Sequence, residues 1–501
     1  MSDPLTDIPG KTPNLDAFRA EPAKVEIHVI ERMLIWILAF HLCLMPWCLG
    51  GTPIWSQFLS ALLSVAEISL ALLPRKYRAN QLFPEAVTLN TYPKLLKFPF
   101  FWGGLALILY ILLQSINPAF AYATDGRVWW IHPIAYLHWL PTSVQSPFER
   151  MNAWRTNLIY ASAWLTGCAV WVGFTRRRSL QALFMSLIFN GCLLSLVGIA
   201  QKVHGYGKIL GFIKPVAGSY FSTFLYKNHA GAYLNLILGL SAALGLWYFR
   251  RGERRLEKST PAGFFGFCSA FVGIAIALSD SRAATLIMIG FLLCALFYFL
   301  TIAIKDKTPG KNPILIGSSV CVFFAFLLFS GFSLKLERTI SRFNDLRNAD
   351  RQTSVDYRLT AASAAWDMAH DRIVTGWGAG SFRFCFPIYQ AKHPSIMTAQ
   401  GMGRIFWEHA HNDYAEFVGE IGLVGTFILI VVCAFWIVQV VRLFFWENSL
   451  GLLILIALLG TLAHAWMDFP FHNPAILSLW VTIFVSCPKW LEFEQRTFAR
   501  A

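Results

Sequence analysis

The sequence predicts an all-α integral membrane protein with about twelve transmembrane helices and a large helical loop between the ninth and the tenth. Hydrophobic residues make up 56% of the 501 positions and charged residues only 14%, with a mean hydropathy of +0.51. This is too apolar for a soluble protein of two or three domains. The apolar residues gather in runs long enough to cross a bilayer, and the basic residues fall in alternate gaps between these runs.

Runs of about 17 to 25 predominantly apolar residues mark the candidate spans. The first six are Val25–Leu49, Trp55–Leu73, Phe98–Ile116, Asn157–Phe174, Leu180–Ala200 and Ala230–Phe249. The other six are Pro261–Leu278, Ala283–Ile304, Pro313–Phe332, Tyr414–Val441, Leu450–Trp466 and the short run Pro474–Cys487. The chain is therefore expected to divide into a tail (1–24), spans one to nine (25–332), an outer loop (333–408), spans ten to twelve (409–488) and a second tail (489–501).

The basic residues predict the orientation of these spans, because lysine and arginine near span ends remain in the cytoplasm. Alternate gaps carry the clusters Arg75–Arg78, Arg176–Arg178, Arg250–Arg255, Lys305–Lys311, Arg442, and Lys489 with the tail. Twelve spans place all of these clusters on one side, so both termini are expected in the cytoplasm. The opposite face then receives three polar stretches, 117–156, 201–229 and 333–408.

The net charge of +14 does not indicate nucleic-acid binding. The lysines and arginines lie in the short gaps between spans, where membrane topology requires them, so we expect no nucleic-acid partner. Most of the ten cysteines lie inside apolar runs and should behave as small hydrophobic residues. No disulfide framework is visible. The polar N-terminal stretch shows no cleavable signal, so the first span should remain as an anchor.

The first outer stretch is rich in tryptophan, including Trp129, Trp130, Trp139 and Trp154. This composition is typical of an aromatic layer at a membrane interface. A platform on which sugars stack is the alternative, and anchoring among lipid headgroups is favoured over it.

In the long outer loop, Leu359, Ala362, Trp366, Ala369 and Ile373 recur at helical spacing. They predict an amphipathic helix lying on the membrane face. Glycines at 376, 378 and 380 should end it.

The stretch from Trp407 to Gly425 joins this polar loop to the apolar run that begins at Tyr414. His409, His411 and their neighbours should therefore lie at the membrane boundary. Unpaired N–H groups at the first turn of such a helix suit an anionic ligand and disfavour a second proton on a nearby imidazole. A neutral histidine there is a candidate general base.

Two other interpretations of His409 and His411 stay open. The pair could bind zinc, but residues two apart do not share a helix face and no third ligand set with familiar spacing exists. We therefore expect no metal. A histidine could also cap the helix or satisfy a buried partner. Asn412 and Asp413 suit an N-cap under every interpretation. His464, Asp468 and His472 around the last outer turn are expected to be structural or interfacial polar residues.

Further polar groups project onto the same outer face: Lys227-Asn228-His229, Asp280-Ser281-Arg282 and Arg358. Arg282 is the most informative, since the gap between two long apolar runs leaves its guanidinium little room to reach bulk water. An anionic partner is expected. Asp280 is the structural candidate for this partner. A diphosphate is the functional one, because its oxygens match the planar fork of arginine.

These residues resemble the O-antigen ligase and polymerase superfamily of multi-span membrane enzymes. The resemblance is carried by His411-Asn412, nine residues, Gly422, two residues and Gly425, within a stretch that reads His-Ala-His-Asn-Asp-Tyr at residues 409–414. It also covers Ser281-Arg282-Ala283, Lys227-Asn228-His229-Ala230 and the segment 376–382, and so spans about residues 200 to 440. Two positions depart from the family pattern: Asp280 stands where a small residue is expected, and Lys227 where proline or another residue is frequent.

The resemblance implies a glycosyltransferase of the bacterial inner membrane that moves a glycan from undecaprenyl diphosphate to an acceptor hydroxyl at the periplasmic face. In ligases the acceptor is the lipid A-core saccharide, and in polymerases it is another carrier-linked repeat. No metal or cofactor is implied. His411 matches the catalytic histidine, and Arg282 and Arg358 match the diphosphate-binding arginines. Substrate contacts are expected from Lys227, Asn228, His229, His409, Asn412 and Asp413.

Three alternatives to the ligase stay open: a polymerase of the same superfamily, a transferase that glycosylates protein, and a transporter of a lipid-linked precursor. Transport is disfavoured, because the polar groups cluster at one face beside a long loop rather than near the bilayer midplane.

Overall fold

A computed structural model describes residues 27–77, 87–205, 207–215, 219–255, 259–305, 354–399 and 403–498. The fold is mostly helical, as predicted. The helices are α2 (Val29–Trp47), α3 (Ile54–Leu72), α4 (Tyr92–Leu96), α5 (Pro99–Ile116), α6 (Ala153–Gly173), α7 (Arg177–His204) and α8 (Lys227–Arg255). The remainder are α9 (Ala262–Leu278), α10 (Arg282–Lys305), α13 (Ser354–Asp371), α14 (Phe382–Gln390), α15 (Asp413–Arg442), α16 (Ser449–Ala465) and α17 (Pro474–Phe498).

Eight helices in the described part of the chain are long and apolar enough to cross a membrane: α2, α3, α5, α7, α8, α10, α15 and α17. Two more, α9 and α16, are apolar but shorter. Helix α6 occupies the predicted fourth span. Eleven of the twelve predicted spans therefore coincide with helices. The ninth, Pro313–Phe332, lies outside the described residues, so the number of twelve stays a prediction.

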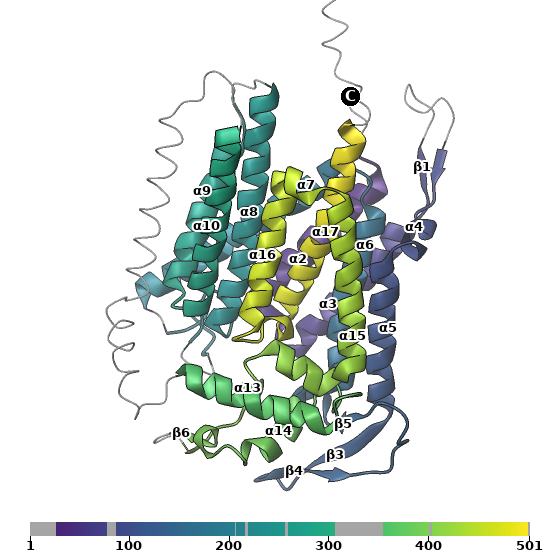
Figure 1. The fold of residues 1–501 in the computed structure, drawn as a ribbon, viewed down its shortest axis with the longest axis vertical. Helices are drawn as coiled ribbons and strands as arrows, with labels where there is room; N and C mark the ends of the chain where they lie inside the picture. Colours follow the sequence, from purple (N-terminus) through teal and green to yellow (C-terminus); the bar gives the residue numbers. More distant parts are fainter. Residues whose placement is uncertain are drawn as a thin grey trace, which may run out of the picture.

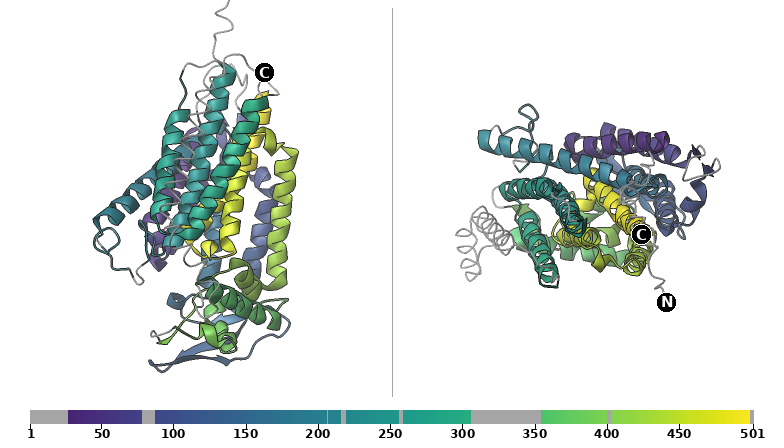
Figure 2. Two further views of the ribbon diagram at one scale, coloured as in Figure 1. Left: turned by 60° about the vertical axis from the view of Figure 1, so that its left-hand side comes forward. Right: turned by 90° about the horizontal axis from the view of Figure 1, so that it is seen from above.

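The long helices lie side by side in one bundle (Figure 1), which the end-on view in Figure 2 shows in cross-section. Helices α8 and α17 form its centre. In their most apolar 18-residue stretches, 78% and 89% of the residues are buried. Helices α13 and α14 lie across one end of the bundle, and the C-terminus lies at the other (Figure 1). The described residues of the predicted outer loop, from 354 on, are thus collected at a single end of the bundle.

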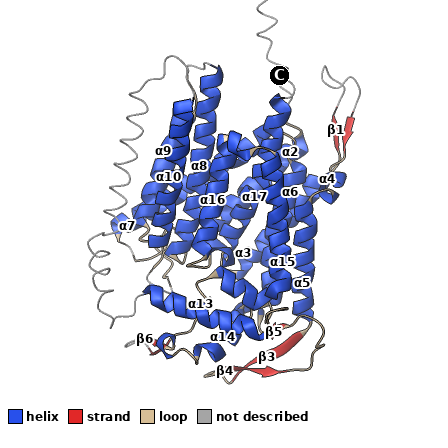
Figure 3. Ribbon diagram, in the orientation of Figure 1, coloured by secondary structure: helices blue, strands red, loops and turns tan. Residues whose placement is uncertain are grey.

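Three small β-sheets accompany the helices (Figure 3). The largest joins β4 (Trp129–Pro133), β3 (Pro118–Thr124) and β5 (Ser143–Gln145) in that order. β3 pairs antiparallel with β4 and parallel with β5. The other two sheets are the hairpins β1 (Arg75–Tyr77) with β2 (Val87–Leu89), and β6 (Thr398–Ala399) with β7 (Gly403–Arg404). The aromatic outer stretch is therefore a sheet, because alternating aromatic and small residues suit a half-buried strand.

The predicted surface helix exists as α13, and the residues of its predicted apolar stripe are divided between buried and exposed positions, with Ala369 buried. Leu359 and Trp366 are half exposed, whereas Ala361, Ala365 and Met368 are buried. The alanines at 361 and 365 let α13 approach α15 closely, and the Met368 methyl group lies next to Gly419. Close packing of small residues, rather than a stripe of large apolar ones, holds α13 against the bundle.

Helix α15 is interrupted at Gly422, whose φ of 63° and ψ of −171° are not helical. The segment that follows α13 packs against this break. Leu423 N–H donates to the Ile373 carbonyl at 2.8 Å, and Trp377 N–H donates to the Gly419 carbonyl at 2.8 Å. These two backbone hydrogen bonds fix the position of the first turns of α15, and of the histidines before them, relative to α13.

Candidate active site at the outer end of the bundle

A cleft of about 510 Å³ opens where α13, the start of α15 and two loops meet. Its walls are mostly aromatic and carry an arginine and two histidines. The lining residues are Tyr226, Tyr357, Arg358, Ile405, Phe406, Trp407, Glu408, His409, His411 and Phe469. Three residues predicted for the site, His411, Arg358 and His409, thus line a common cavity.

His411 is held in the cleft by its backbone and by a buried carboxylate. Its φ of 52° is in the left-handed region, which is uncommon for a residue other than glycine. Its ring lies between Trp407 and Phe469, at centroid distances of 5.6 and 4.9 Å. The Nδ1 atom lies 3.3 Å from Oδ1 of Asp468. A neutral His411 that donates this Nδ1–H keeps the lone pair on Nε2.

Asp468 joins several parts of the site, although only 1% of its side chain is exposed. It accepts from Asn228 Nδ2 and from the N–H of Phe469 at 3.0 Å. Burial disfavours its ionised form, but the hydrogen bond from His411 and the charges of His464 and Arg358 hold its pKa below the ordinary range. Asp468 is therefore a carboxylate, the form that orients a histidine.

Arg358 reaches the cleft from α13. One terminal nitrogen donates to the Met467 carbonyl at 2.9 Å and the other to the Tyr226 hydroxyl at 3.2 Å. Tyr226 also accepts from Asn228 Nδ2 at 2.7 Å. Burial and the Asp468 carboxylate raise the pKa of Tyr226, so its hydroxyl stays neutral. These bonds orient the guanidinium without neutralising it.

Arg282 begins α10 and is exposed. Its neighbour Ser281 donates to Asn228 Oδ1 at 2.7 Å, and Asn228 in turn contacts Asp468. A continuous chain of hydrogen bonds thus joins the start of α10 to His411. Arg282 and Arg358 both lie within electrostatic range of Lys227 at the start of α8. The three predicted cations are gathered at one end of the bundle.

Asp280, the structural partner expected for Arg282, does not pair with it. Asp280 forms an ion pair with Lys202 of α7 instead. Asp280 has a φ of 58°, a turn after which α10 begins. Within the described residues no carboxylate pairs with Arg282, so its guanidinium can meet an anion from solution.

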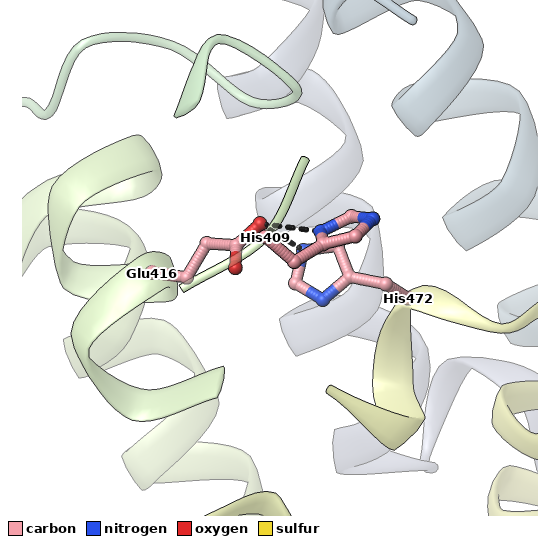
Figure 4. Close-up of side chains that lie close together, drawn as sticks. All are labelled: His409, Glu416 and His472. Atoms are coloured by element: carbon pink, nitrogen blue, oxygen red, sulfur yellow. Dashed lines mark hydrogen bonds and ion pairs between the residues drawn. The ribbon is translucent and has the colours of Figure 1, made fainter. Parts of the chain in front are cut away.

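His409 belongs to a second, deeper network (Figure 4). Its Nδ1 lies 2.7 Å from Glu416 Oε1, and His472 lies 3.2 Å from the same oxygen through Nε2. His472 Nδ1 bonds Asp413 Oδ1 at 2.7 Å. Burial opposes the charge on His472, but Glu416 and Asp413 outweigh burial and raise its pKa to about 10. Burial and the positive His472 lower the pKa of His409, which is neutral.

The same atoms could hold a metal ion. Ligand atoms of His409, Glu416 and His472 all lie within 4.8 Å of one another. Asp413 hydrogen-bonds the other ring nitrogen of His472, as carboxylates often do to orient metal-bound histidines. A proton on His472 accounts for the same arrangement without a metal, because the charged ring then lies between Asp413 and Glu416. The zinc interpretation that pairs His409 with His411 is not supported, since the two imidazoles face different carboxylates.

The remaining predicted residues have defined places. Asn412 is the N-cap of α15, and its side chain accepts from Ala415 N–H at 3.0 Å, which confirms the N-cap expected of Asn412. Asp413 is buried against His472 and Phe471, away from the cleft lining. The ring of His229 packs edge-on against Phe469 at 4.8 Å, and its Nε2 has no hydrogen-bond partner among the described residues.

Sequence reasoning missed three residues. Asp468 was taken for a structural or interfacial residue, yet it contacts His411. Tyr226 and Phe469 line the cleft and stack on each other at 5.7 Å. The sequence does show an aspartate, Asp468, in the short gap between two apolar runs. No spacing in the chain connects this gap to His411.

A bundle of membrane-length helices with a polar and aromatic cleft at one end is the architecture of a multi-pass membrane protein. A family model described as O-antigen ligase matches residues 267–430, so this third of the chain is similar to that family, as the motifs predicted. The match contains Arg282, Arg358 and His411, whereas Lys227 and Asp468 lie outside it. A comparison with curated proteins finds no match. The family supports ligase- or polymerase-type chemistry on lipid-linked glycans.

Proposed function

We propose that this protein is a glycosyltransferase that takes a glycan from undecaprenyl diphosphate and attaches it to a hydroxyl of the lipid A-core, at the periplasmic face of the inner membrane. The observation that carries the proposal is the His411–Asp468 pair. His411 lines a common cleft with Arg358, and Asp468, buried behind it, is joined by hydrogen bonds to the helix start bearing Arg282.

In the proposed reaction, the acceptor hydroxyl gives its proton to Nε2 of His411 as its oxygen attacks the anomeric carbon of the donor. Asp468 stabilises the imidazolium that forms. The bond between the anomeric carbon and the diphosphate oxygen breaks, and its electron pair leaves with the diphosphate. Attack from the side opposite the leaving group inverts the anomeric centre. A positioned general base contributes about 10² to 10⁴ in rate.

The leaving diphosphate gains negative charge, which fixed cations can stabilise without reorganisation. Arg358 in the cleft wall and Arg282 at the start of α10 supply the guanidinium groups, and Lys227 supplies a third positive charge nearby. Helix starts also present unpaired N–H groups, which favour anions. In this proposal the reaction needs no metal.

Deletion of the gene, followed by separation of lipopolysaccharide from carrier-linked glycan, tests the proposal. A ligase predicts that full-length glycan accumulates on the carrier while the core stays bare. Single repeats on the core would indicate a polymerase of the same family instead. Complementation with His411→Ala should fail although the protein is made at the normal level, and carrier binding should remain measurable. Restored lipopolysaccharide in this strain would exclude the general-base role.

A further inference from the structure

Two hydrogen-bond acceptors of the cleft lie in the short segment that ends at His411. The first is Glu408, which lines the cleft with 64% of its side chain exposed. Arg383 of α14 lies 3.9 Å from one of its oxygens, which is too long for a hydrogen bond. Within the part of the chain that the structure describes, no hydrogen bond occupies the Glu408 carboxylate, so both of its oxygens can accept from a ligand.

The second acceptor is His409. Its Nδ1 lies 2.7 Å from Glu416 Oε1, and Glu416 Oε2 accepts from the Ala410 N–H at 2.8 Å. Glu416 also faces the charged His472 and is a carboxylate, so Nδ1 of His409 is the donor of this bond. The lone pair of His409 then remains on Nε2, which has no partner among the described residues and is not a buried atom. Since His409 lines the cleft, this nitrogen can accept from a ligand hydroxyl.

The positive charge of the cleft is held by other elements. Arg358 belongs to α13 and donates to the Met467 carbonyl and the Tyr226 hydroxyl, whereas Glu408 lies next to Arg383 of α14. The guanidinium of Arg358 suits a diphosphate, and a carboxylate repels one. Free acceptors instead require a ligand that brings O–H or N–H groups, and a sugar is such a ligand.

We propose that Glu408 and His409 bind the acceptor sugar through hydroxyls other than the one that reacts. This inference rests on the proposed function, in which His411 takes the proton of the reacting hydroxyl. The acceptor attacks from the side opposite the diphosphate, so it lies beside His411, where Glu408 and His409 are its neighbours in the chain. The half-exposed ring of Phe406 in the same cleft wall offers an apolar surface for the C–H face of a sugar.

The proposal defines the class of acceptor. It is a sugar with at least two free hydroxyls besides the reacting one. It carries no phosphate or carboxylate beside the reacting hydroxyl, because the charge of Glu408 would repel such a group.

The test uses full-length protein in lipid nanodiscs, with carrier-linked glycan as donor and the lipid A-core of the deletion strain as acceptor. Glu408→Gln should raise KM for the acceptor about tenfold, the loss of one charge-assisted hydrogen bond, and leave KM for the donor unchanged. Glu149→Gln is the matched control, because Glu149 is exposed near the start of α6 but does not line the cleft. Equal shifts of the two KM values, or an unchanged KM for the acceptor, would overturn the proposal.

His409→Phe keeps a flat ring but removes the acceptor nitrogen. It should raise KM for the acceptor about three- to tenfold with little change in kcat, because the general base remains. His409→Gln, which can donate to Glu416 and accept from a hydroxyl, should recover part of this loss. His393→Phe is the control, since His393 also pairs with a carboxylate but lies outside the cleft lining. A fall of kcat by about 10² with unchanged KM would assign proton transfer to His409 and contradict its role in binding.

Binding of the core oligosaccharide alone separates this proposal from the proposed function. The oligosaccharide released from lipid A by mild acid carries no lipid, and its binding can be followed by the fluorescence of Trp407 in the cleft wall. Wild-type protein should bind it, and Glu408→Gln should weaken binding about tenfold. If this is observed but no glycan is ever transferred, only the transferase proposal fails. If transfer occurs but the oligosaccharide does not bind, or binds equally to wild type and Glu408→Gln, the proposal for Glu408 and His409 fails.

Discussion

His411 and Asp468, separated by 57 positions in the chain, meet with Nδ1 of the imidazole 3.3 Å from Oδ1 of the carboxylate. The carboxylate is buried and ionised, and the imidazole opens on the cleft. This arrangement can hold a single tautomer of the histidine with Nε2 free to accept a proton.

Asp468→Asn should lower kcat about 10- to 10³-fold, because an amide does not select the tautomer that leaves Nε2 unprotonated. Transfer from carrier-linked glycan measures the effect. A double-mutant cycle with His411→Ala should be strongly non-additive, since the two residues act as one unit. Asp367→Asn is the matched control: Asp367 also pairs with a histidine, His393, at 3.2 Å, but is half exposed on α13. Equal losses in the two variants would contradict a specific role for Asp468.

Arg282→Gln should lower kcat/KM about 10- to 100-fold, the loss of one or two charge-assisted hydrogen bonds to a diphosphate. Arg282→Lys should recover only part of it, because a point charge lacks the planar fork. Asp280→Asn should leave transfer near wild type, since its partner is Lys202. Full activity of Arg282→Lys would argue against bidentate phosphate binding.

Gly422→Ala should destabilise the protein by about 1 to 3 kcal/mol, the range for a strained backbone position. A Cβ atom there would lie 2.3 Å from the Val374 carbonyl oxygen, and the φ of 63° is unfavourable for alanine. Gly290→Ala in α10 is the control, because nothing lies within 4 Å of its added Cβ. Thermal unfolding in detergent compares the two. An unchanged melting temperature in Gly422→Ala would show that the break in α15 can relax.

Stability should decrease as pH rises from about 6.5 towards 10. The His472 pKa is raised by Glu416 and Asp413 to about 10, so its stabilising charge is fully present below its ordinary pKa of 6.5 and is lost as the pH passes through the raised value. The groups that face it are Asp413, Glu416 and neutral His409. His472→Gln should flatten the pH dependence of the melting temperature, whereas exposed His132→Gln should not. The same slope in both variants would contradict this assignment.

Transfer should survive a chelator. In the proposed mechanism arginines stabilise the diphosphate, and a protonated His472 between Asp413 and Glu416 supplies the positive charge that a metal would bring. Elemental analysis of purified protein, with and without chelator, should find no stoichiometric metal that activity follows. One equivalent of zinc lost together with activity, and its absence in His472→Gln, would instead assign His409, Glu416 and His472 as ligands.

The sequence alone determined the features that depend on local composition. Eleven apolar runs coincide with helices, because an apolar run of about 20 residues is long enough to cross a bilayer as one helix. Asn412 caps α15 as its residue type predicts. His411 and Arg358 were recognised through motifs, and both line the cleft.

Only the tertiary structure decided which side chains meet. Asp468 reaches His411 from the turn between α16 and α17, and Asp280 pairs with Lys202 rather than Arg282. Helix α13 buries Ala361, Ala365 and Met368 rather than Leu359 and Trp366. Each outcome depends on which helices pack together and on how closely their backbones approach. Periodicity reports the faces of single helices, whereas the partners of a buried charge are chosen by contacts between segments far apart in the chain.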